Sequence, residues 1–240
     1  MNVRRGAAPV RVVLLDIEGT TTPIAFVHDV LFPYARERLA AWFAGRSPSD
    51  PAVREIVDGV RQELAAEQPG VTVSAATVAA QLLRFMDADR KSRSLKTLQG
   101  LIWQRGYERG ELQGQVYADV PDAFERWSRA GIGIGIYSSG SVLAQTLLFG
   151  HSTAGDLTRY LRWHFDTAVG GKKETSSYAR IADRIGHPAR DVLFVSDVEA
   201  ELDAARGAGM QTRLCVRERA AAAGAGAAHP IVRGLDEIAV

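Results

Sequence analysis

Short apolar runs alternate along most of the chain with stretches that have helical period. Each run is bounded by turn residues, and strands that alternate with helices in this way predict a parallel sheet covered by helices. One run has strict period two, since Ile132, Ile134 and Ile136 alternate with glycines that leave a bare face for close helix packing. The predicted strands are Val10–Leu15, Gly131–Tyr137, Asp166–Val169, Val192–Val195, Gln211–Val216 and Ile231–Val232, and the clearest helical patterns are Tyr178–Ile185 and Ala200–Ala208.

The interval from about residue 26 to residue 120 has a different pattern and contains no convincing strand. Asp50-Pro51 places proline at a first helical position, which is a typical helix start. We therefore predict an α/β core formed by residues 1–25 and 121–240, with an all-helical cap formed by residues 26–120. The cap is inserted after the first strand and is expected to fold over the carboxyl ends of the strands. Its helical patterns begin near Val30, Pro51, Ser74 and Ser94.

Composition places the chain among ordinary globular proteins. It has 240 residues, of which 46% are hydrophobic and 24% charged. A net charge of +1 gives no electrostatic footprint for nucleic acid or an anionic membrane. No apolar run approaches the roughly 20 residues needed to span a bilayer, and the amino terminus lacks the apolar region of a secretory signal. These features predict a cytoplasmic protein with neither nucleic acid nor membrane as a partner.

Two rare residue types narrow the possible chemistry. Cys215 is the single cysteine, which excludes an intramolecular disulfide and argues against a cysteine-based zinc site. Its strand-like surroundings predict a small buried hydrophobe. Lysine occurs four times against 25 arginines, so a lysine near a candidate site is of interest for its compact ammonium group. The Ala/Gly-rich segment Arg217–His229 predicts a flexible surface loop.

Two carboxylates follow the first predicted strand, one residue apart, as Asp16-x-Glu18. Ligands of parallel sheets bind just beyond the carboxyl ends of the strands. Residues i and i+2 of an extended chain point the same way, so Asp16 and Glu18 can converge on one reacting atom. One carboxylate could attack as a nucleophile while the other moves protons. Taken alone, the same motif is equally typical of a solvated acidic turn.

Three further polar groups follow other predicted strands. Ser138-Ser139-Gly140-Ser141 offers hydroxyl and backbone N–H donors that suit phosphate oxygens, although it could equally cap the next helix. Lys172 follows two glycines and can offset anionic charge. Asp197 follows the fourth strand and, together with Asp16, suits Mg²⁺, which prefers oxygen ligands.

The order of these groups resembles the haloacid-dehalogenase-like (HAD) phosphohydrolase superfamily, which has a Rossmann-like parallel-sheet core and a helical cap. The superfamily usually has D-x-D in the first motif. The string from Asp16 to Ile24, with Glu18 as its second acid, is similar instead to the enolase-phosphatase (acireductone synthase) branch of methionine salvage. The resemblance runs from about Val12 to Arg217. Later stretches that carry it are Leu95–Trp103, Tyr137–Ser141, Leu147–Ser152 and Ser196-Asp197.

The resemblance implies roles for the acids. Asp16 is implied as the nucleophile and a Mg²⁺ ligand. Glu18 is implied as the general acid/base, which also ligates the metal through its backbone carbonyl. Asp197 completes the metal site, and Glu201, one helical turn later, orients Asp197 or a metal-bound water. No organic cofactor is implied.

The resemblance also implies the substrate and how it is bound. Ser138, Ser139 and Lys172 are implied to bind the phosphate of 2,3-diketo-5-methylthiopentyl-1-phosphate. The family enolises this phosphorylated diketone and then removes its phosphate, and the resemblance favours a monomer. Other enzymes of the same scaffold remain open: a phosphatase of another small metabolite, a phosphomutase or a dehalogenase. A non-catalytic phosphate-binding or partner-binding module is the remaining alternative.

The base that takes the proton during enolisation is not identified by the sequence. Glu18 is one candidate, because it is one methylene longer than the usual aspartate. Lys96, Gln99 and Trp103 are others, because their spacing places them on one helix face. For Trp103 we favour packing against a core instead. Two histidines are expected to be structural or exposed rather than catalytic: His28 and His151.

Overall fold

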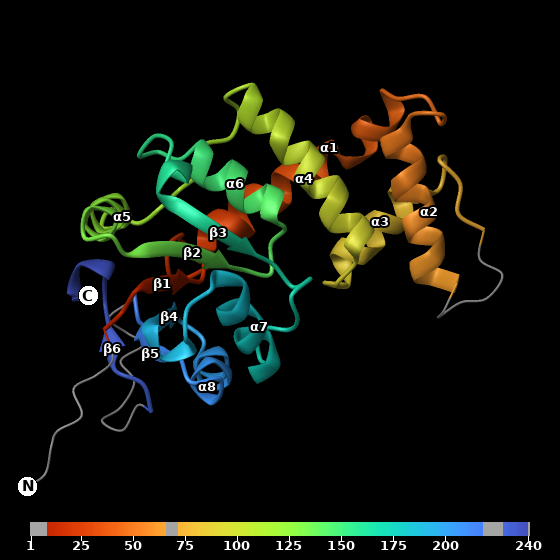
Figure 1. The fold of residues 1–240 in the computed structure, drawn as a ribbon. Coiled ribbons are helices and arrows are strands. Elements are labelled where there is room, and N and C mark those ends of the chain that lie inside the picture. Colours follow the sequence, from red (N-terminus) through yellow and green to blue (C-terminus); the bar gives the residue numbers. More distant parts are fainter. Residues whose placement is uncertain (1–8, 66–71, 218–227, 240) are drawn as a thin grey trace, which may run out of the picture. The chain divides into compact units, whose positions relative to one another are not determined.

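The computed structural model describes residues 9–65, 72–217 and 228–239. The chain divides into two compact units, Met1–Ile24 with Gly114–Val240, and Ala25–Gln113. The first unit contains a six-stranded sheet of order β3-β2-β1-β4-β5-β6, in which all neighbouring strands are parallel (Figure 1). The strands are β1 (Val12–Leu15), β2 (Gly133–Tyr137), β3 (Leu161–Phe165), β4 (Val192–Ser196), β5 (Gln211–Cys215) and β6 (Ile231–Val232).

Helices cover this sheet, as the alternation of strands and helical patterns predicted. The helix α5 contacts β2 and α6 contacts β3, whereas α8 packs against α7, β4 and β5 (Figure 1). The helices are α5 (Val120–Arg129), α6 (Val142–Gly150), α7 (Thr175–Ile185) and α8 (Glu199–Gly207). Short 3-10 turns occupy Thr158–Tyr160, Ala189–Asp191 and Leu235–Glu237.

The central strands explain where a site can form. Every residue of β1 is fully buried, as expected for a continuous apolar run between two parallel neighbours. Leu15 pairs with Ile136 of β2 and with Val195 of β4, so these three strands end in line. The polar residues that follow them are therefore brought to one edge of the sheet. Cys215 in β5 is 1% exposed, which confirms the prediction of a buried hydrophobe.

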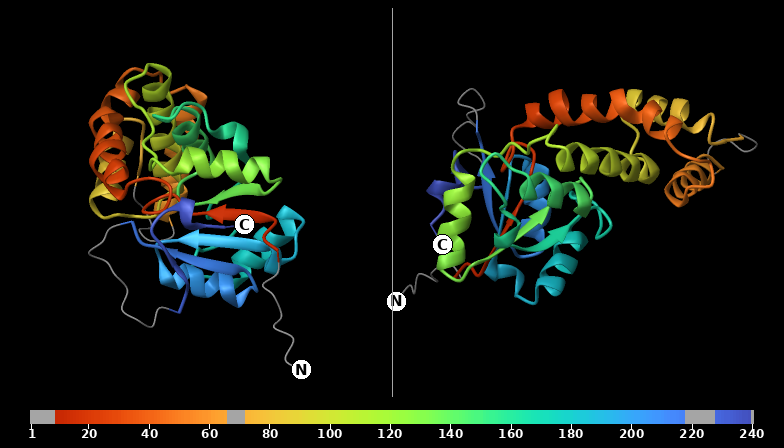
Figure 2. Two further views of the ribbon diagram at one scale, coloured as in Figure 1. Left: turned by 90° about the vertical axis from the view of Figure 1, so that its left-hand side faces the viewer. Right: turned by 90° about the horizontal axis from the view of Figure 1, so that it is seen from above.

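The regular secondary structure in the described part of the second unit is helical. A π-helical turn, Phe26–Leu31, leads directly into α1, which runs beside α4 (Figure 2). Asp50 caps α2 as its sequence suggests, since its Oδ1 accepts the N–H of Ala52 at 2.9 Å. The four helices are α1 (Phe32–Ala44), α2 (Pro51–Ala65), α3 (Val78–Asp87) and α4 (Arg93–Glu108). None of the helices in the described ranges combines the length and apolar content needed to cross a bilayer.

The end of the helical segment lies earlier than residue 120. The N–H of Gly114 donates to His151 O at 2.8 Å, and the N–H of Thr153 donates to Gly114 O at 2.8 Å. Further along, Tyr117 N–H donates to Thr21 O at 3.0 Å. These backbone bonds attach the stretch after Gln113 to the α/β unit. The stretch has no periodic pattern, so its distant partners could not be identified from the sequence.

The third strand was wrongly placed at Asp166–Val169. The strand is Leu161–Phe165, and Asp166 instead begins a turn, because its carbonyl accepts the N–H of Val169 and its side chain accepts the N–H of Ala168. β3 lies at the edge of the sheet beside β2, where polar side chains are tolerated. These polar side chains interrupt the apolar pattern by which the strand could have been predicted.

The Ala/Gly-rich segment Arg217–His229 falls mostly outside the described residues. The prediction of a surface loop is therefore untested for residues 218–227, which lie outside the described residues, whereas Arg217 at its start is only 9% exposed and is ion-paired with Asp119.

Candidate active site

The loop after β1 is a tight turn rather than extended chain. Asp16 N–H still donates to Val195 O at 3.0 Å, so Asp16 continues the ladder with β4. Beyond it, the carbonyl of Ile17 accepts the N–H groups of Thr20, Thr21 and Thr22. The assumption of an extended D-x-E was therefore wrong, and Glu18 lies within the turn. Asp16 itself is 4% exposed.

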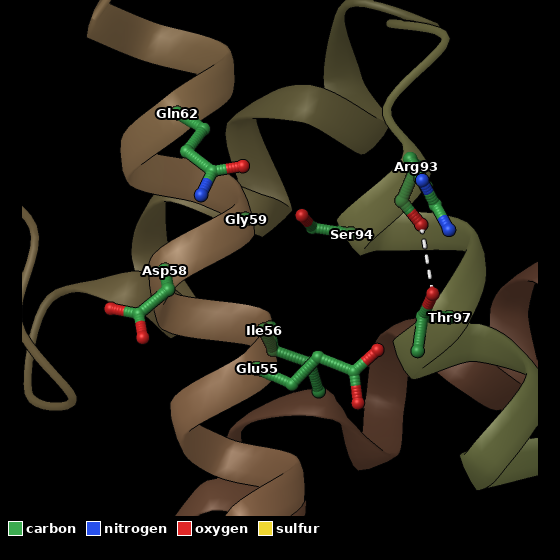
Figure 3. Close-up of a pocket in the computed structure, with 8 residues that line it drawn as sticks. All are labelled: Glu55, Ile56, Asp58, Gly59, Gln62, Arg93, Ser94 and Thr97. Carbon is green, nitrogen blue, oxygen red and sulfur yellow. Dashed lines mark hydrogen bonds between the residues drawn. The ribbon is translucent and has the colours of Figure 1, made fainter.

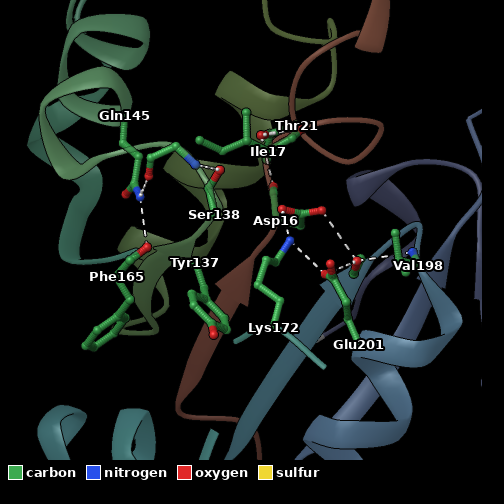
Figure 4. Close-up of polar contacts among 12 residues, drawn as sticks. Asp16, Ile17, Thr21, Tyr137, Ser138, Gln145, Phe165, Lys172, Val198 and Glu201 are labelled. Atoms are coloured by element: carbon green, nitrogen blue, oxygen red, sulfur yellow. Dashed lines mark hydrogen bonds and ion pairs between the residues drawn. The ribbon is translucent and has the colours of Figure 1, made fainter. Parts of the chain in front are cut away.

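Lys172 reaches the end of β1 and contacts two carboxylates (Figure 4). Its Nζ lies 2.6 Å from Asp16 Oδ1 and 2.7 Å from Glu201 Oε2. Burial opposes the charge on Lys172, but the two carboxylates outweigh it and hold its pKa above the ordinary value. Burial, and then the charge of Asp16, raise the pKa of Glu201, while Lys172 acts in the opposite direction. The result is a buried cation beside the first acid of the motif.

The backbone of the Lys172 loop is fixed by two tyrosines that the sequence analysis missed. The Tyr178 hydroxyl donates to Lys172 O at 2.7 Å, and the Tyr137 hydroxyl donates to Gly170 O at 2.9 Å. Both rings belong to the core and lie edge to face with each other. Tyr137 immediately precedes the serine cluster, which is the sequence signal that could have pointed to it.

Ser196, the last residue of β4, is a third residue to which the sequence analysis gave no role. It is completely buried, and its hydroxyl donates to Glu201 Oε2 at 3.0 Å while accepting the N–H of Val198 at 3.2 Å. It also lies 3.5 Å from Asp16 Oδ2. The sequence signal that could have identified Ser196 is its position as the one polar residue at the end of an apolar strand. Ser196 thereby orients Glu201 towards Lys172, whereas the resemblance implied that Glu201 orients Asp197 or a metal-bound water.

Asp197 lies against the turn that carries Glu18. Gly19 has φ +70°, and a Cβ added there would collide with the Asp197 carboxylate. Burial, and then the charge of Asp16, raise the pKa of Asp197 to about 6; Glu18 adds to this and Lys172 opposes it.

The donor set at this edge fits Mg²⁺ rather than a metal held entirely by protein side chains. Among the described residues there is no group of three His, Cys, Asp or Glu side chains that could hold a metal. Mg²⁺ typically takes one or two carboxylates and completes its shell with waters and substrate phosphate. Asp16 and Asp197 offer such a pair. Burial, and after it the charge of Asp16, raises the pKa of Asp197, and a bound cation would favour the ionised form of this carboxyl.

One of the two roles considered for the serine cluster, capping of the next helix, is confirmed. Ser141 is the N-cap of α6 and accepts the N–H of Ala144 at 3.2 Å. Ser138, 4% exposed, directly follows β2, and its Oγ accepts the N–H of Gly140 at 3.1 Å (Figure 4). Ser139 is exposed. Gln145 braces this loop by donating to the carbonyls of Gly140 and Phe165.

In the helical unit, Trp103 is structural, as expected. Its indole N–H donates to Leu31 O at 2.8 Å, and its ring lies near Phe32. Gln99 is buried and Lys96 partly buried. His28 and His151 are both exposed.

A groove of about 260 Å³ lies on the helical unit between α2 and α4 (Figure 3). Its lining residues are Glu55, Ile56, Asp58, Gly59, Gln62, Arg93, Ser94 and Thr97.

Comparison with known proteins links this geometry to a family. A model of the haloacid dehalogenase-like hydrolase family matches residues 10–209. The chain is 53% identical over 209 residues to Enolase-phosphatase E1 of Synechococcus elongatus, covering 85% of this chain and 87% of that protein. It is 47% identical over 230 residues to Enolase-phosphatase E1 of Klebsiella oxytoca, covering 95% and 96%. Among solved structures, the UTR4 protein of Saccharomyces cerevisiae matches with TM-score 0.79 and 36% identity, covering 95% of this chain and 100% of that one.

Proposed function

The chain belongs to the haloacid dehalogenase-like hydrolases and, within them, to the enolase-phosphatases, and we propose that its substrate is 2,3-diketo-5-methylthiopentyl-1-phosphate. The reaction enolises the diketone and then hydrolyses the ester, which gives 1,2-dihydroxy-3-keto-5-methylthiopentene and phosphate in methionine salvage. The proposed setting is the cytoplasm, and one chain is the proposed functional unit. The observation that carries the proposal is the buried Lys172 ammonium 2.6 Å from the Asp16 carboxylate.

In the proposed phosphoryl transfer, a carboxylate oxygen of Asp16 attacks phosphorus and the bond from phosphorus to the ester oxygen breaks. Glu18 donates a proton to that leaving oxygen. A water molecule then attacks the aspartyl-phosphate while Glu18 takes its proton, which releases phosphate and regenerates both acids. Lys172 offsets the charge on the phosphoryl oxygens, which would otherwise repel the attacking carboxylate. Ser138 and Ser139 hold the same oxygens by hydrogen bonds.

Mg²⁺ is the proposed metal, held by Asp16, the backbone carbonyl of Glu18 and Asp197. Its chemistry when bound is to neutralise charge on the transferring phosphoryl group. Burial raises the pKa of Asp197 and the charges of Asp16 and Glu18 add to this, so a cation beside Asp197 would favour its ionised form, which supports this assignment.

Enolisation needs no organic cofactor, because the carbon that bears the phosphate lies next to a carbonyl and its proton is already acidified. Two sets of groups are candidates for the base that removes this proton. One is Glu18, and the other is the polar pair Lys96 and Gln99 of α4.

The test follows the ultraviolet absorbance of the enol and the release of phosphate together, with the diketone phosphate and Mg²⁺. The wild-type protein is expected to produce both signals, and Asp16→Asn is expected to release no phosphate. Asp183→Asn, on an exposed position of α7, is the matched control and should retain full activity. Phosphate release by Asp16→Asn at the wild-type rate would exclude the aspartyl-phosphate route. A wild-type protein that hydrolyses other phosphate esters but not this one would favour a phosphatase of another metabolite.

A further inference from the structure

Arg217 and Asp119 form a largely buried ion pair at the carboxyl end of β5. Arg217 Nη1 lies 2.8 Å from both carboxylate oxygens of Asp119, and the two side chains are 9% and 18% exposed. The guanidinium also lies over the ring of Tyr117, with Cζ 4.2 Å from the ring centroid. Asp119 in turn accepts the backbone N–H of Leu235. All four residues belong to the α/β unit.

This ion pair is joined to the turn that follows β1. The carbonyl of Thr20 accepts hydrogen bonds from Arg217 Nε, at 3.0 Å, and from Arg217 Nη2. The next carbonyl, that of Thr21, accepts the N–H of Tyr117 at 3.0 Å. Two consecutive carbonyls of the turn are therefore held by one cluster formed by Tyr117, Asp119 and Arg217.

Other carbonyls of the turn are satisfied from within it. Asp16 O accepts the Thr21 hydroxyl, Ile17 O accepts three N–H groups, and Thr22 O accepts the N–H of Gly19. Thr20 is completely buried, so its carbonyl needs a partner that water cannot replace. Arg217 supplies that partner from a position 197 residues later in the chain.

We propose that Arg217 and Asp119 are positioning residues, which hold the turn in the conformation that presents Glu18 to the reacting ester. The proposal rests on the role given to Glu18 in the proposed function. Glu18 and Gly19 lie two residues and one residue before Thr20, so a shift of the Thr20 peptide moves Glu18 and the Gly19 contact with Asp197 together. The planar fork of arginine binds Asp119, bonds Thr20 and stacks on Tyr117 at once, which a lysine cannot do.

The first test compares Arg217→Lys and Asp119→Asn with wild type, using the diketone phosphate and saturating Mg²⁺. We expect kcat to fall by about 10- to 100-fold, since displacing a catalytic group by roughly 1 Å has this size of effect. KM should stay within about threefold, because Glu18 acts on the leaving oxygen rather than in binding. Arg206→Lys is the matched control: Arg206 pairs with Asp203 at 2.6 Å on α8, outside the turn and its cluster, and its loss should leave kcat unchanged.

Amide hydrogen exchange gives a readout that does not depend on activity. The N–H groups of Gly19 to Thr22, which bond within the turn, should exchange faster in Arg217→Lys while those of β1 and β4 stay protected. Unchanged kcat together with unchanged exchange in both variants would overturn the proposal. So would failure of both variants to fold, since the pair would then serve the whole domain rather than the turn.

A second test asks whether Arg217 acts through Glu18. In a Glu18→Gln background, measured by single turnover with enzyme in excess, adding Arg217→Lys should change the residual rate by less than about threefold. A full additional loss in that background would contradict the proposal and assign Arg217 a role independent of Glu18. If the wild-type protein itself released no phosphate from the diketone phosphate, the proposed function would fail, whereas the exchange measurement would still report on the turn.

Discussion

Glu201 Oε2 lies 2.7 Å from Lys172 Nζ. Glu201 therefore contacts the lysine of the site, although the sequence suggested that it would orient Asp197, one helical turn earlier. Ser196 donates to the same Glu201 oxygen at 3.0 Å and fixes its orientation. The ammonium group is therefore held on one side by the proposed nucleophile, Asp16, and on another by a residue with no proposed contact to substrate. Glu201 acts by holding Lys172 in place.

Replacing Glu201 by glutamine should lower kcat for phosphate release by about 10-fold, or roughly 1.4 kcal/mol, because a neutral amide holds an ammonium group less tightly than a carboxylate does. Steady-state phosphate release at saturating Mg²⁺ is the measurement. Glu199→Gln is the control, since Glu199 is an exposed acid on the same helix. Equal losses in the two variants would point to the helix rather than to the Lys172 contact.

Gly19→Ala should lose both stability and activity. The backbone at Gly19 has φ +70°, which costs an L-residue about 1–2 kcal/mol, and the added methyl group would collide with Asp197. Gly131→Ala separates the two effects, because Gly131 has φ +75° but nothing within 4 Å of the position of a Cβ. Chemical denaturation should show a lower free energy of unfolding in both variants, because both positions have the same backbone strain. Phosphate release should fall only in Gly19→Ala; comparable activity in the two would contradict the contact with Asp197.

The parts of the fold that sequence predicted best are those where burial is uniform. Strand β1 and, up to its last residue Ser196, strand β4 are apolar, because both strands are buried at the centre of the sheet, and such runs are recognisable without knowing the partners. The edge strand β3 mixes Arg162 and His164 with apolar residues, so the apolar stretch after it was chosen instead. In the second unit, the start of a helix could be predicted where a capping residue precedes it, as Asp50 precedes α2.

The candidate site was predictable as a set of residue types after strands, but not as a set of contacts. Asp16, Lys172 and Asp197 could be assigned to one edge because parallel strands end together. The partner of Glu201 could not be predicted, because a side chain in the first turn of α8 can face either Asp197 or the loop of Lys172. The pairing of Arg217 with Asp119 depends on residues 98 apart that belong to no periodic pattern.

The thiol of Cys215 should be unreactive in the native protein. Burial raises its pKa to about 11; Arg217 lowers it, and Asp119 and Asp197 add to the rise. At pH 8 only about one thiol in a thousand is then ionised, so a disulfide reagent should modify the unfolded protein rapidly and the native protein very slowly. Rapid stoichiometric labelling of native protein at pH 8 would contradict the burial of this strand.

The raised pKa of Cys215 also makes the free energy of unfolding depend on pH. Because the folded-state pKa of Cys215 lies above its unfolded value of about 8.5, the stability that this thiol contributes is complete below pH 8.5 and is lost as pH rises towards 11. Denaturant midpoints measured between pH 8 and pH 11 should therefore fall less steeply for Cys215→Ala than for wild type. Parallel curves would show that another group accounts for the loss.

Magnesium should stabilise the protein through Asp197. In the metal-free protein this carboxylate is partly buried near the charge of Asp16, and its raised pKa of about 6 means that folding opposes its ionised form at neutral pH. Asp197→Asn should consequently be at least as stable as wild type in EDTA. Millimolar Mg²⁺ should raise the melting temperature of wild type and leave that of Asp197→Asn unchanged, because only the binding-competent protein gains stability from the ion.

A control variant makes the magnesium prediction specific to this carboxylate. Asp203→Asn removes an exposed acid of α8 and should respond to Mg²⁺ as wild type does. Thermal unfolding of the three proteins is measured with EDTA and then with Mg²⁺, and phosphate release is assayed under the same conditions. Asp197→Asn should be inactive in both, and wild type should lose activity in EDTA and regain it with Mg²⁺. A wild-type melting temperature unaffected by Mg²⁺ would contradict the proposed ligand pair, Asp16 and Asp197, whatever the activity of the protein.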